Sequence, residues 1–305
     1  MAIKQENMLL KIGIGEFCHE LIRRWTWVAA SGIAVGIVFG IFAWTTYDTY
    51  RADVLLVPNS VNDASGLSAM ASQFGGLANL AGLSIPQAKD KTTLALQVLE
   101  SRQFLNEFAR NRNLEVPLIA VKGWNKETDT AIYDLEKFDP KTNTWLKRQS
   151  GESTYYPTTT ELYLALMRLI EIEYNKTEQT VSISFVYYEK HRSKQYLDWL
   201  ISDLNENMRN AEVLELQRTV DYLTEKAESA SNVDIQTSFY RIIEERLKAI
   251  ALASVRLEYV LKTIDPAITP EEKYAPKRAL IVVLGVLVGS LFGSCGICIS
   301  IMFRR

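Results

Sequence analysis

The feature that most limits how this chain can fold is a pair of long uncharged apolar runs, one near each end. The first run covers Trp25–Tyr47 and the second covers Ala279–Phe303, and neither contains Asp, Glu, Lys or Arg. At a rise of 1.5 Å per residue, each run would form a helix roughly 33–38 Å long, which exceeds a hydrocarbon core of about 30 Å. The sequence therefore predicts two membrane-spanning helices.

The first run is typical of a retained anchor rather than a cleaved signal peptide. Its apolar stretch is longer than the core of a signal peptide, which is roughly 7–15 residues, and no A-x-A-like cleavage site follows it. Aromatic residues lie at both margins, as they do in the interfacial belts of membrane helices. These residues are Trp25, Trp27, Trp44, Tyr47 and Tyr50.

Positive charges predict the orientation of the chain. Lys4, Lys11, Arg23 and Arg24 precede the first run and favour a cytoplasmic N-terminus. The second run has two basic residues on each side and gives no preference. The expected organisation is a cytoplasmic tail 1–24, a first span 25–47, an extracytoplasmic region 48–276, a second span 279–303 and a cytoplasmic end 304–305.

Glycine recurs at every fourth position in both predicted spans, and this spacing places it on one helix face, where another helix can approach closely. The two series are Gly32, Gly36 and Gly40, and Gly285, Gly289 and Gly293. We expect these faces to pack the spans on each other or on neighbouring subunits. The second span also contains Cys295 and Cys298, which we interpret as packing residues because no second cysteine pair or histidine accompanies them.

The middle region predicts an α+β domain near the membrane with a long projecting helical arm. Alternating and helical periodicities distinguish its segments. Strands are expected at Tyr50–Pro58, Val116–Val121, Thr180–Tyr188 and Leu257–Ile264, helices at Asp90–Arg110, Pro157–Tyr174 and 190–253, a loop at 59–86, and a hairpin or loop at Lys122–Tyr156. Within the long helix, Ser229–Asp234 predicts a break or kink. A helix of that length could run roughly 60 Å or more and would project from the domain.

Composition gives no positive sign of catalysis. The formal net charge of −2 argues against a nucleic-acid binder that depends on a basic surface. The chain has only two histidines, His19 and His191. A catalytic site that pairs a nucleophile with histidine would need one of them, and the middle region has no cysteine to serve as the nucleophile. The phosphate-binding pattern GxxxxGK[ST] is absent. We therefore expect no catalytic residues, no metal site and no cofactor.

Three prolines shape the segment that leads into the second span. Pro266, Pro270 and Pro276 fix backbone angles and remove amide donors, so the segment 265–276, called the proline-rich strap below, should be extended rather than helical. Lys277 and Arg278 follow it directly and should lie at the depth of the lipid headgroups. Contact with lipid phosphates explains them, and a lipid-linked anionic substrate is a further candidate.

These features together resemble the Wzz polysaccharide co-polymerases, the chain-length determinants of O-antigen and enterobacterial common antigen. The resemblance extends over the whole chain and is most specific in the strap, which ends in Pro276 and Lys277, and in the glycine-spaced second span. The family strap usually reads P-x2-P-x4-S-P-K. Here the first gap is one residue longer and Ala275 replaces the serine. The chain carries neither a Walker motif nor a tyrosine-rich tail, which places the resemblance in the kinase-free class.

The resemblance implies a non-enzymatic regulator. Members form ring-shaped inner-membrane homo-oligomers whose long helices project into the periplasm, and they act with a Wzy-type polymerase. Membrane lipid and lipid-linked polysaccharide are the other implied partners, and nucleic acid is not expected. Two alternatives remain open from the sequence: an export adaptor for capsule or exopolysaccharide that works with a separate tyrosine kinase, and a periplasmic sensor or receptor. A membrane-anchored hydrolase is disfavoured by the missing catalytic groups.

Overall fold

The computed structural model describes residues 23, 25–59, 88–146 and 156–303, with side chains described up to residue 297. The loop expected at 59–86 and the basic residues of the N-terminal tail before Arg23 lie outside the described residues, apart from Asn59. The chain forms two compact units. A membrane unit combines residues up to Thr49 with those from Lys273 onward, and a globular unit comprises Tyr50–Glu272.

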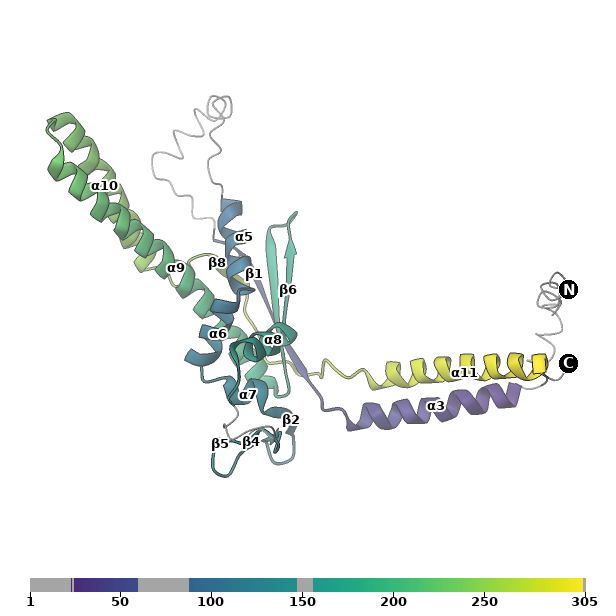
Figure 1. Ribbon diagram of the computed structural model, residues 1–305. Helices are drawn as coiled ribbons and strands as arrows, with labels where there is room; N and C mark the ends of the chain where they lie inside the picture. The colour runs from purple at the N-terminus through teal and green to yellow at the C-terminus, as the bar shows by residue number, and fades with distance from the viewer. Residues whose placement is uncertain (1–22, 24, 60–87, 147–155, 304–305) are drawn as a thin grey trace, which may run out of the picture. The chain divides into compact units, whose positions relative to one another are not determined.

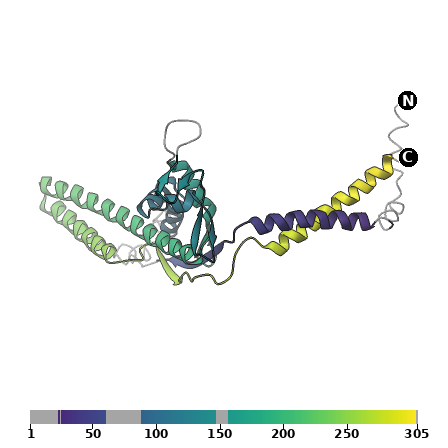
Figure 2. The same ribbon diagram turned by 90° about the horizontal axis from the view of Figure 1, so that it is seen from below.

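The membrane unit is a pair of long apolar helices that run side by side (Figures 1 and 2). They are α3 (Trp25–Thr45) and α11 (Arg278–Phe303). Only 17% of the most apolar stretch of each helix is buried in the structure, whereas a core helix of a soluble protein would be mostly buried. Both helices are long and apolar enough to cross a membrane. The chain is therefore a two-pass membrane protein.

The globular unit is built on a four-stranded antiparallel sheet in the order β6-β7-β1-β8. Its strands are β1 (Tyr50–Pro58), β6 (Ile170–Asn175), β7 (Thr180–Tyr187) and β8 (Leu261–Asp265). The first and last segments of the unit thus pair with each other at β1 and β8. A tight turn joins β6 to β7, where the Asn175 side chain accepts the amides of Thr177 and Glu178 at 3.0 and 3.2 Å.

One face of this sheet carries the hydrophobic core. Alternate residues of β1 and β7 point toward helices because side chains of a strand alternate between its two faces. The buried residues are Ala52, Val54, Leu56, Val181, Ile183 and Phe185. The helices of this unit include α5 (Ala88–Leu99), α6 (Arg102–Asn111), α7 (Glu115–Ile119), α8 (Thr159–Leu169) and the long α9 (Lys190–Ser229). Of these, α5, α8 and α9 contact strands of the sheet.

Several predicted elements differ in the structure. Val116–Val121, expected as a strand, contains α7, because Pro117 lies in the first turn of a helix, where its missing amide donor is not needed. The helix expected at Asp90–Arg110 is divided by Ser101, whose hydroxyl accepts the Phe104 amide and begins α6.

The segment Pro157–Tyr174 is also not one helix. A capping box between Thr158 and Glu161 begins α8 as expected, but the helix ends at Leu169 and the chain continues directly as β6. The strand expected at Leu257–Ile264 begins only at Leu261. In both places the strand exists because a partner strand, β7 or β1, supplies its hydrogen bonds.

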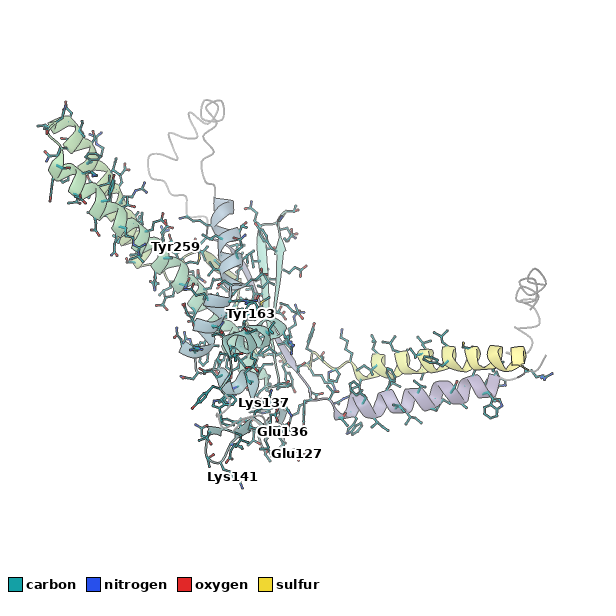
Figure 3. The ribbon with its side chains drawn as sticks, viewed as in Figure 1. Glu127, Glu136, Lys137, Lys141, Tyr163 and Tyr259 are labelled. Atoms are coloured by element: carbon teal, nitrogen blue, oxygen red, sulfur yellow. The ribbon has the colours of Figure 1, made fainter. Side chains whose placement is uncertain are left out.

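Two small antiparallel hairpins occupy the segment expected as hairpin or loop. They are formed by β2 (Val121–Asn125) with β3 (Thr130–Tyr133), and by β4 (Phe138–Asp139) with β5 (Thr144–Trp145). Figure 3 labels charged side chains in and between these hairpins, Glu127, Glu136, Lys137 and Lys141. The Phe138 ring packs between those of Tyr133 and Trp145, at centroid distances of 5.6 and 5.2 Å, and joins the two hairpins.

The predicted long helix is a helical hairpin. Helix α9 ends at Ser229, and α10 (Val233–Ser254) runs back along it (Figures 1 and 2). The break expected at Ser229–Asp234 is therefore a reversal of direction. Asn232 caps α10 by accepting the Asp234 amide at 2.8 Å, and Gln236 reaches back to the Ala227 carbonyl at 3.2 Å. At 1.5 Å per residue, the 40 residues of α9 give an arm about 60 Å long.

Candidate functional site

Glycine forms the contact surface between the two membrane helices. A side-chain carbon built at Gly289 would lie 2.6 Å from the Ser31 carbonyl oxygen and 2.9 Å from the Cα of Gly32. At Gly285 the same carbon would lie 2.8 Å from the Phe39 ring, and at Gly36 it would lie 2.6 Å from the Val286 side chain. Each distance is shorter than real contacts of such an atom. The two helices approach this closely because these positions have no side chain.

Three positions of the glycine series remain. At Gly32 an added carbon would lie 2.6 Å from the Ser290 hydroxyl oxygen, and Gly293 and Gly40 differ in how tightly they pack. Gly293 faces Ser31, whose Oγ would lie 2.1 Å from an added carbon, whereas at Gly40 the nearest atom is 3.5 Å away on Val282, an ordinary contact. Gly296, outside the series, meets nothing within 4 Å. The helices are therefore closest around Gly289 and Gly293.

A hydrogen bond joins the two helices at this closest point. The Ser31 hydroxyl lies 3.0 Å from the Gly289 carbonyl oxygen and 2.8 Å from the Val28 carbonyl oxygen of its own helix. A hydroxyl has one hydrogen to donate, so it is shared between these two acceptors. Close backbone approach and such polar contacts are the main means by which helices associate in lipid, where burial of apolar surface drives no association.

The C-terminal part of the proline-rich strap is tied to the end of α3. The Thr49 amide donates to the Ala275 carbonyl at 2.8 Å, and the Tyr274 amide donates to the Thr49 carbonyl at 2.8 Å. Pro276 then precedes α11 and is partly exposed. In the globular unit, Pro266 and Pro270 follow β8 on either side of the buried Ala267. After Asp265, which is the last residue of β8, the strap contains no helix or ladder strand, as its prolines predict.

A charged cluster occupies the same end of the two membrane helices. The Arg278 guanidinium lies 2.9 Å from Asp48, with its Nη2 on the carboxylate, and its Nε donates to the Ala43 carbonyl at 3.2 Å. The Lys273 ammonium approaches Asp48 at 3.8 Å. Lys277 is exposed. Arg278 is thus held by contacts within its own chain.

The helical hairpin exposes apolar side chains on both flanks of α10. Ile243 is buried against α9, and at 100° per residue two rows lie on either side of it. One row is Val233, Tyr240 and Leu247, and the other is Ile235 and Ile242; their exposed fractions range from 39 to 72%. Contiguous exposed apolar surface on a helix is typical of an interaction surface. Sequence periodicity alone could not separate these rows from the face that packs on α9.

A buried polar side chain, which sequence reasoning missed, joins α9 to β8. Asn205 is 2% exposed and its Oδ1 accepts the amides of Val260 and Leu261 at 2.8 and 3.1 Å. Its Nδ2 donates to the Leu261 carbonyl at 3.1 Å. The amide side chain thus pairs with the backbone at the start of β8 as a neighbouring strand would. The sequence offered one signal for this contact: Asn205 is a polar residue on the side of the predicted long helix that was expected to face the core.

The titratable groups with shifted pKa values serve structural contacts. Burial raises the pKa of Tyr187, whose hydroxyl donates to the Pro117 carbonyl at 3.0 Å. Burial of Asp134 would by itself raise its pKa, but hydrogen bonds from Lys122 and the Glu136 amide prevail and lower it.

His191 is exposed in the first turn of α9, and its backbone amide donates to Glu189. Among the described residues, no three His, Cys, Asp or Glu side chains gather as metal ligands would.

Comparison with known proteins identifies similar solved structures only. No family model matches the chain, and no curated protein does. A full-length bacterial polysaccharide co-polymerase is 12% identical, with 94% of this chain and 97% of that chain covered, at a TM-score of 0.35. A fragment of WzzB, a polysaccharide co-polymerase from Salmonella Typhimurium, is 11% identical, with 75% of this chain and all of that fragment covered, at a TM-score of 0.33.

A third similar structure is a point mutant of WzzBSF, a lipopolysaccharide O-antigen chain-length regulator from Shigella flexneri. It is 10% identical, with 74% of this chain and 100% of that chain covered, at a TM-score of 0.24. TM-scores below 0.5 at such identities carry no argument about function. By their names, two of these three structures are polysaccharide co-polymerases and the third is an O-antigen chain-length regulator.

Proposed function

We propose that this chain is a non-enzymatic, oligomeric regulator of surface polysaccharide chain length in a bacterial inner membrane. The observation that carries the proposal is the segment from the proline-rich strap into the glycine-spaced α11, which resembles the same segment of the Wzz co-polymerases. In this proposal both termini are cytoplasmic and the globular unit is periplasmic, as favoured by the basic residues before α3. The chain acts with a Wzy-type polymerase on lipid-linked O-antigen, and it belongs to the kinase-free class.

The two apolar rows of α10 support the homo-oligomer in this proposal. They lie on opposite flanks of the hairpin, so one flank of a copy can meet the other flank of the next copy. Such head-to-tail contacts use two different surfaces and close into a ring when the rotation per subunit allows it. A two-fold dimer would instead bury the same row on both copies.

Placing a charge on either row should break the oligomer. We expect Leu247→Asp and Ile242→Asp, on opposite rows, each to reduce the full-length protein in detergent to monomers, because a carboxylate would be buried without a partner at every interface. Mass photometry measures the size. Mixing the two variants should restore dimers, since each mixed pair keeps one intact contact.

The matched control is Thr237→Asp, on the polar face of α10. Its carboxylate would lie four residues before Arg241, and an acidic and a basic side chain at this spacing attract each other on a helix. It should leave the size unchanged. Unchanged size in both row variants would contradict the proposed contact, and recovery of full rings on mixing would contradict the head-to-tail arrangement.

The function is tested by deleting the gene in its host and comparing surface-polysaccharide ladders on a gel, with and without a plasmid copy. We expect the modal cluster of long chains to give way to a short-weighted, random ladder and to return with the plasmid. An unchanged ladder would contradict chain-length control and favour a sensor. Complete loss of polymer would also contradict it and would favour an export component.

A further inference from the structure

The charged cluster at the end of the two membrane helices has more positive charge than its own acidic residue can balance. It consists of Asp48, Lys273, Lys277 and Arg278, and is called the basic cluster below. One carboxylate and three cations give a formal charge of +2. Lys277 is exposed, and within the part of the chain that the structure describes it forms no ion pair. Glu271 and Glu272 directly precede Lys273 in the sequence, so the cation of the cluster that is left without a carboxylate partner is Lys277.

The structure holds part of this charge in a fixed position. The Asp48 side chain is 12% exposed and bonds to Arg278 at 2.9 Å, and the Ala43 carbonyl accepts from the same guanidinium at 3.2 Å. A guanidinium has five N–H donors in a planar fork, so these two contacts orient it and leave donors for another acceptor. The exposed fraction of the Arg278 side chain is 39%, which leaves it accessible. A cation held in this way loses less conformational freedom on binding an anion than a free one.

The backbone that leads to Lys277, the residue before Arg278, is restrained. Two hydrogen bonds of 2.8 Å tie Thr49 to Tyr274 and Ala275, immediately before Pro276 and Lys277. Lys277 therefore follows a restrained segment, although its side chain is free. A fixed guanidinium and a mobile ammonium on adjacent residues can contact different oxygens of one multivalent anion.

The basic cluster lies at the level where lipid headgroups are found. It adjoins the end of α3, where Trp44 and Tyr47 are 81 and 42% exposed, and such aromatic residues mark the membrane–water interface. Helix α11 begins at Arg278, and its apolar part follows at once. Anions at this depth are the phosphate groups of lipids.

We propose that Lys277 and Arg278 bind the phosphate of a membrane lipid, with Asp48 as the residue that positions Arg278. The shared chemistry is an anionic phosphate ester at the membrane surface. Two sources supply it: the monophosphate of a glycerophospholipid, and the diphosphate that joins a polyprenol to a saccharide. The second source rests on the function proposed above, and it would bring the sugar-bearing lipid to the end of the membrane helices.

The test measures lipid binding to the full-length protein by native mass spectrometry from detergent, with phosphatidylglycerol and undecaprenyl diphosphate as separate probes. Lys277→Gln should lower the apparent affinity roughly fivefold, which corresponds to about 1 kcal/mol for a cation near an anionic surface. Lys277→Arg should restore binding. The control is Lys262→Gln, which removes an exposed lysine of β8.

The outcomes separate the two sources and separate this site from the proposed function. A loss for both probes supports a general phosphate site, and a loss for undecaprenyl diphosphate alone supports a site for the lipid-linked saccharide. Equal affinity of wild type and Lys277→Gln for both probes would overturn the site, even where gene deletion still shortens the polysaccharide. A reduced affinity together with an unchanged ladder on gene deletion would retain the site and overturn the function.

Discussion

Replacing Gly289 with leucine is expected to separate the two membrane helices and to change the modal polysaccharide length without lowering the amount of protein. The first added carbon would lie 2.6 Å from the Ser31 carbonyl oxygen and 2.7 Å from the Cβ of Val35. Neither atom is the end of a flexible side chain, so the helices themselves must move. The Ser31 to Gly289 hydrogen bond would be lost as well. Overpacking of this kind costs roughly 1–3 kcal/mol or more.

The displacement can be measured directly with spin labels. Ile37 and Leu284 are exposed on α3 and α11, and labels there, in a background without the native cysteines, report the separation of the two helices by pulsed dipolar spectroscopy. We expect a longer and broader distance distribution in Gly289→Leu. The polysaccharide ladder and an immunoblot of membranes from the same strain give chain length and protein amount.

The matched control is Gly296→Leu, the same substitution on the same helix at a position with nothing within 4 Å. It should change neither the distance distribution nor the ladder. If Gly289→Leu only lowered the protein amount, the glycine face would be structural and its proposed role in chain-length control would be wrong. An unchanged distance distribution would contradict the packing of α3 on α11 itself.

Replacing Asn205 with leucine should destabilise the globular unit by roughly 3–5 kcal/mol, because it leaves the amides of Val260 and Leu261 buried without their acceptor. The leucine side chain has the same branched four-atom shape, so the change removes hydrogen bonds and leaves no cavity. Chemical denaturation of the full-length protein in detergent, followed by tryptophan fluorescence, measures the shift in the unfolding midpoint.

The control for this prediction is Asn210→Leu, five residues further along α9 at an exposed position. Its midpoint should remain within the error of the wild type, since surface substitutions away from specific contacts change stability little. Equal midpoints for Asn205→Leu and Asn210→Leu would show that the Asn205 contacts contribute nothing to stability. A shift confined to Asn205→Leu would establish that α9 holds β8, the strand that leads into the proline-rich strap.

The elements that were predicted well depend on residues close together in the chain. The α3 and α11 helices follow from uninterrupted apolar runs, β7 follows from alternation, and β1 follows from a short run of valine and leucine. The end of α9 was foreseen at Ser229–Asp234, where small and polar residues interrupt the pattern. Each of these elements can be predicted from residues that are neighbours in the sequence, without knowledge of a distant contact partner.

The elements that were missed depend on partners far along the chain. The six residues of β6 have an apolar residue at every second position, but the preceding helical pattern of α8 includes them, and only pairing with β7 decides their state. The same holds for β8, whose start is set by β1 and by Asn205, a residue 56 positions away from Leu261. Tertiary contacts override local preference in both cases.

The sequence by itself determined that the chain crosses a membrane twice, that glycine lies on one face of each span, and that a mixed α+β unit with a long helical segment stands between them. Only the tertiary structure decided that the glycine faces meet within one chain, where Ser31 and Gly289 are 258 residues apart. It also decided that the long helical segment folds back as α9 and α10, and that Asp48 holds Arg278. Hydrophobicity and spacing are properties of a segment, whereas the choice of a contact partner depends on the packing of the whole chain.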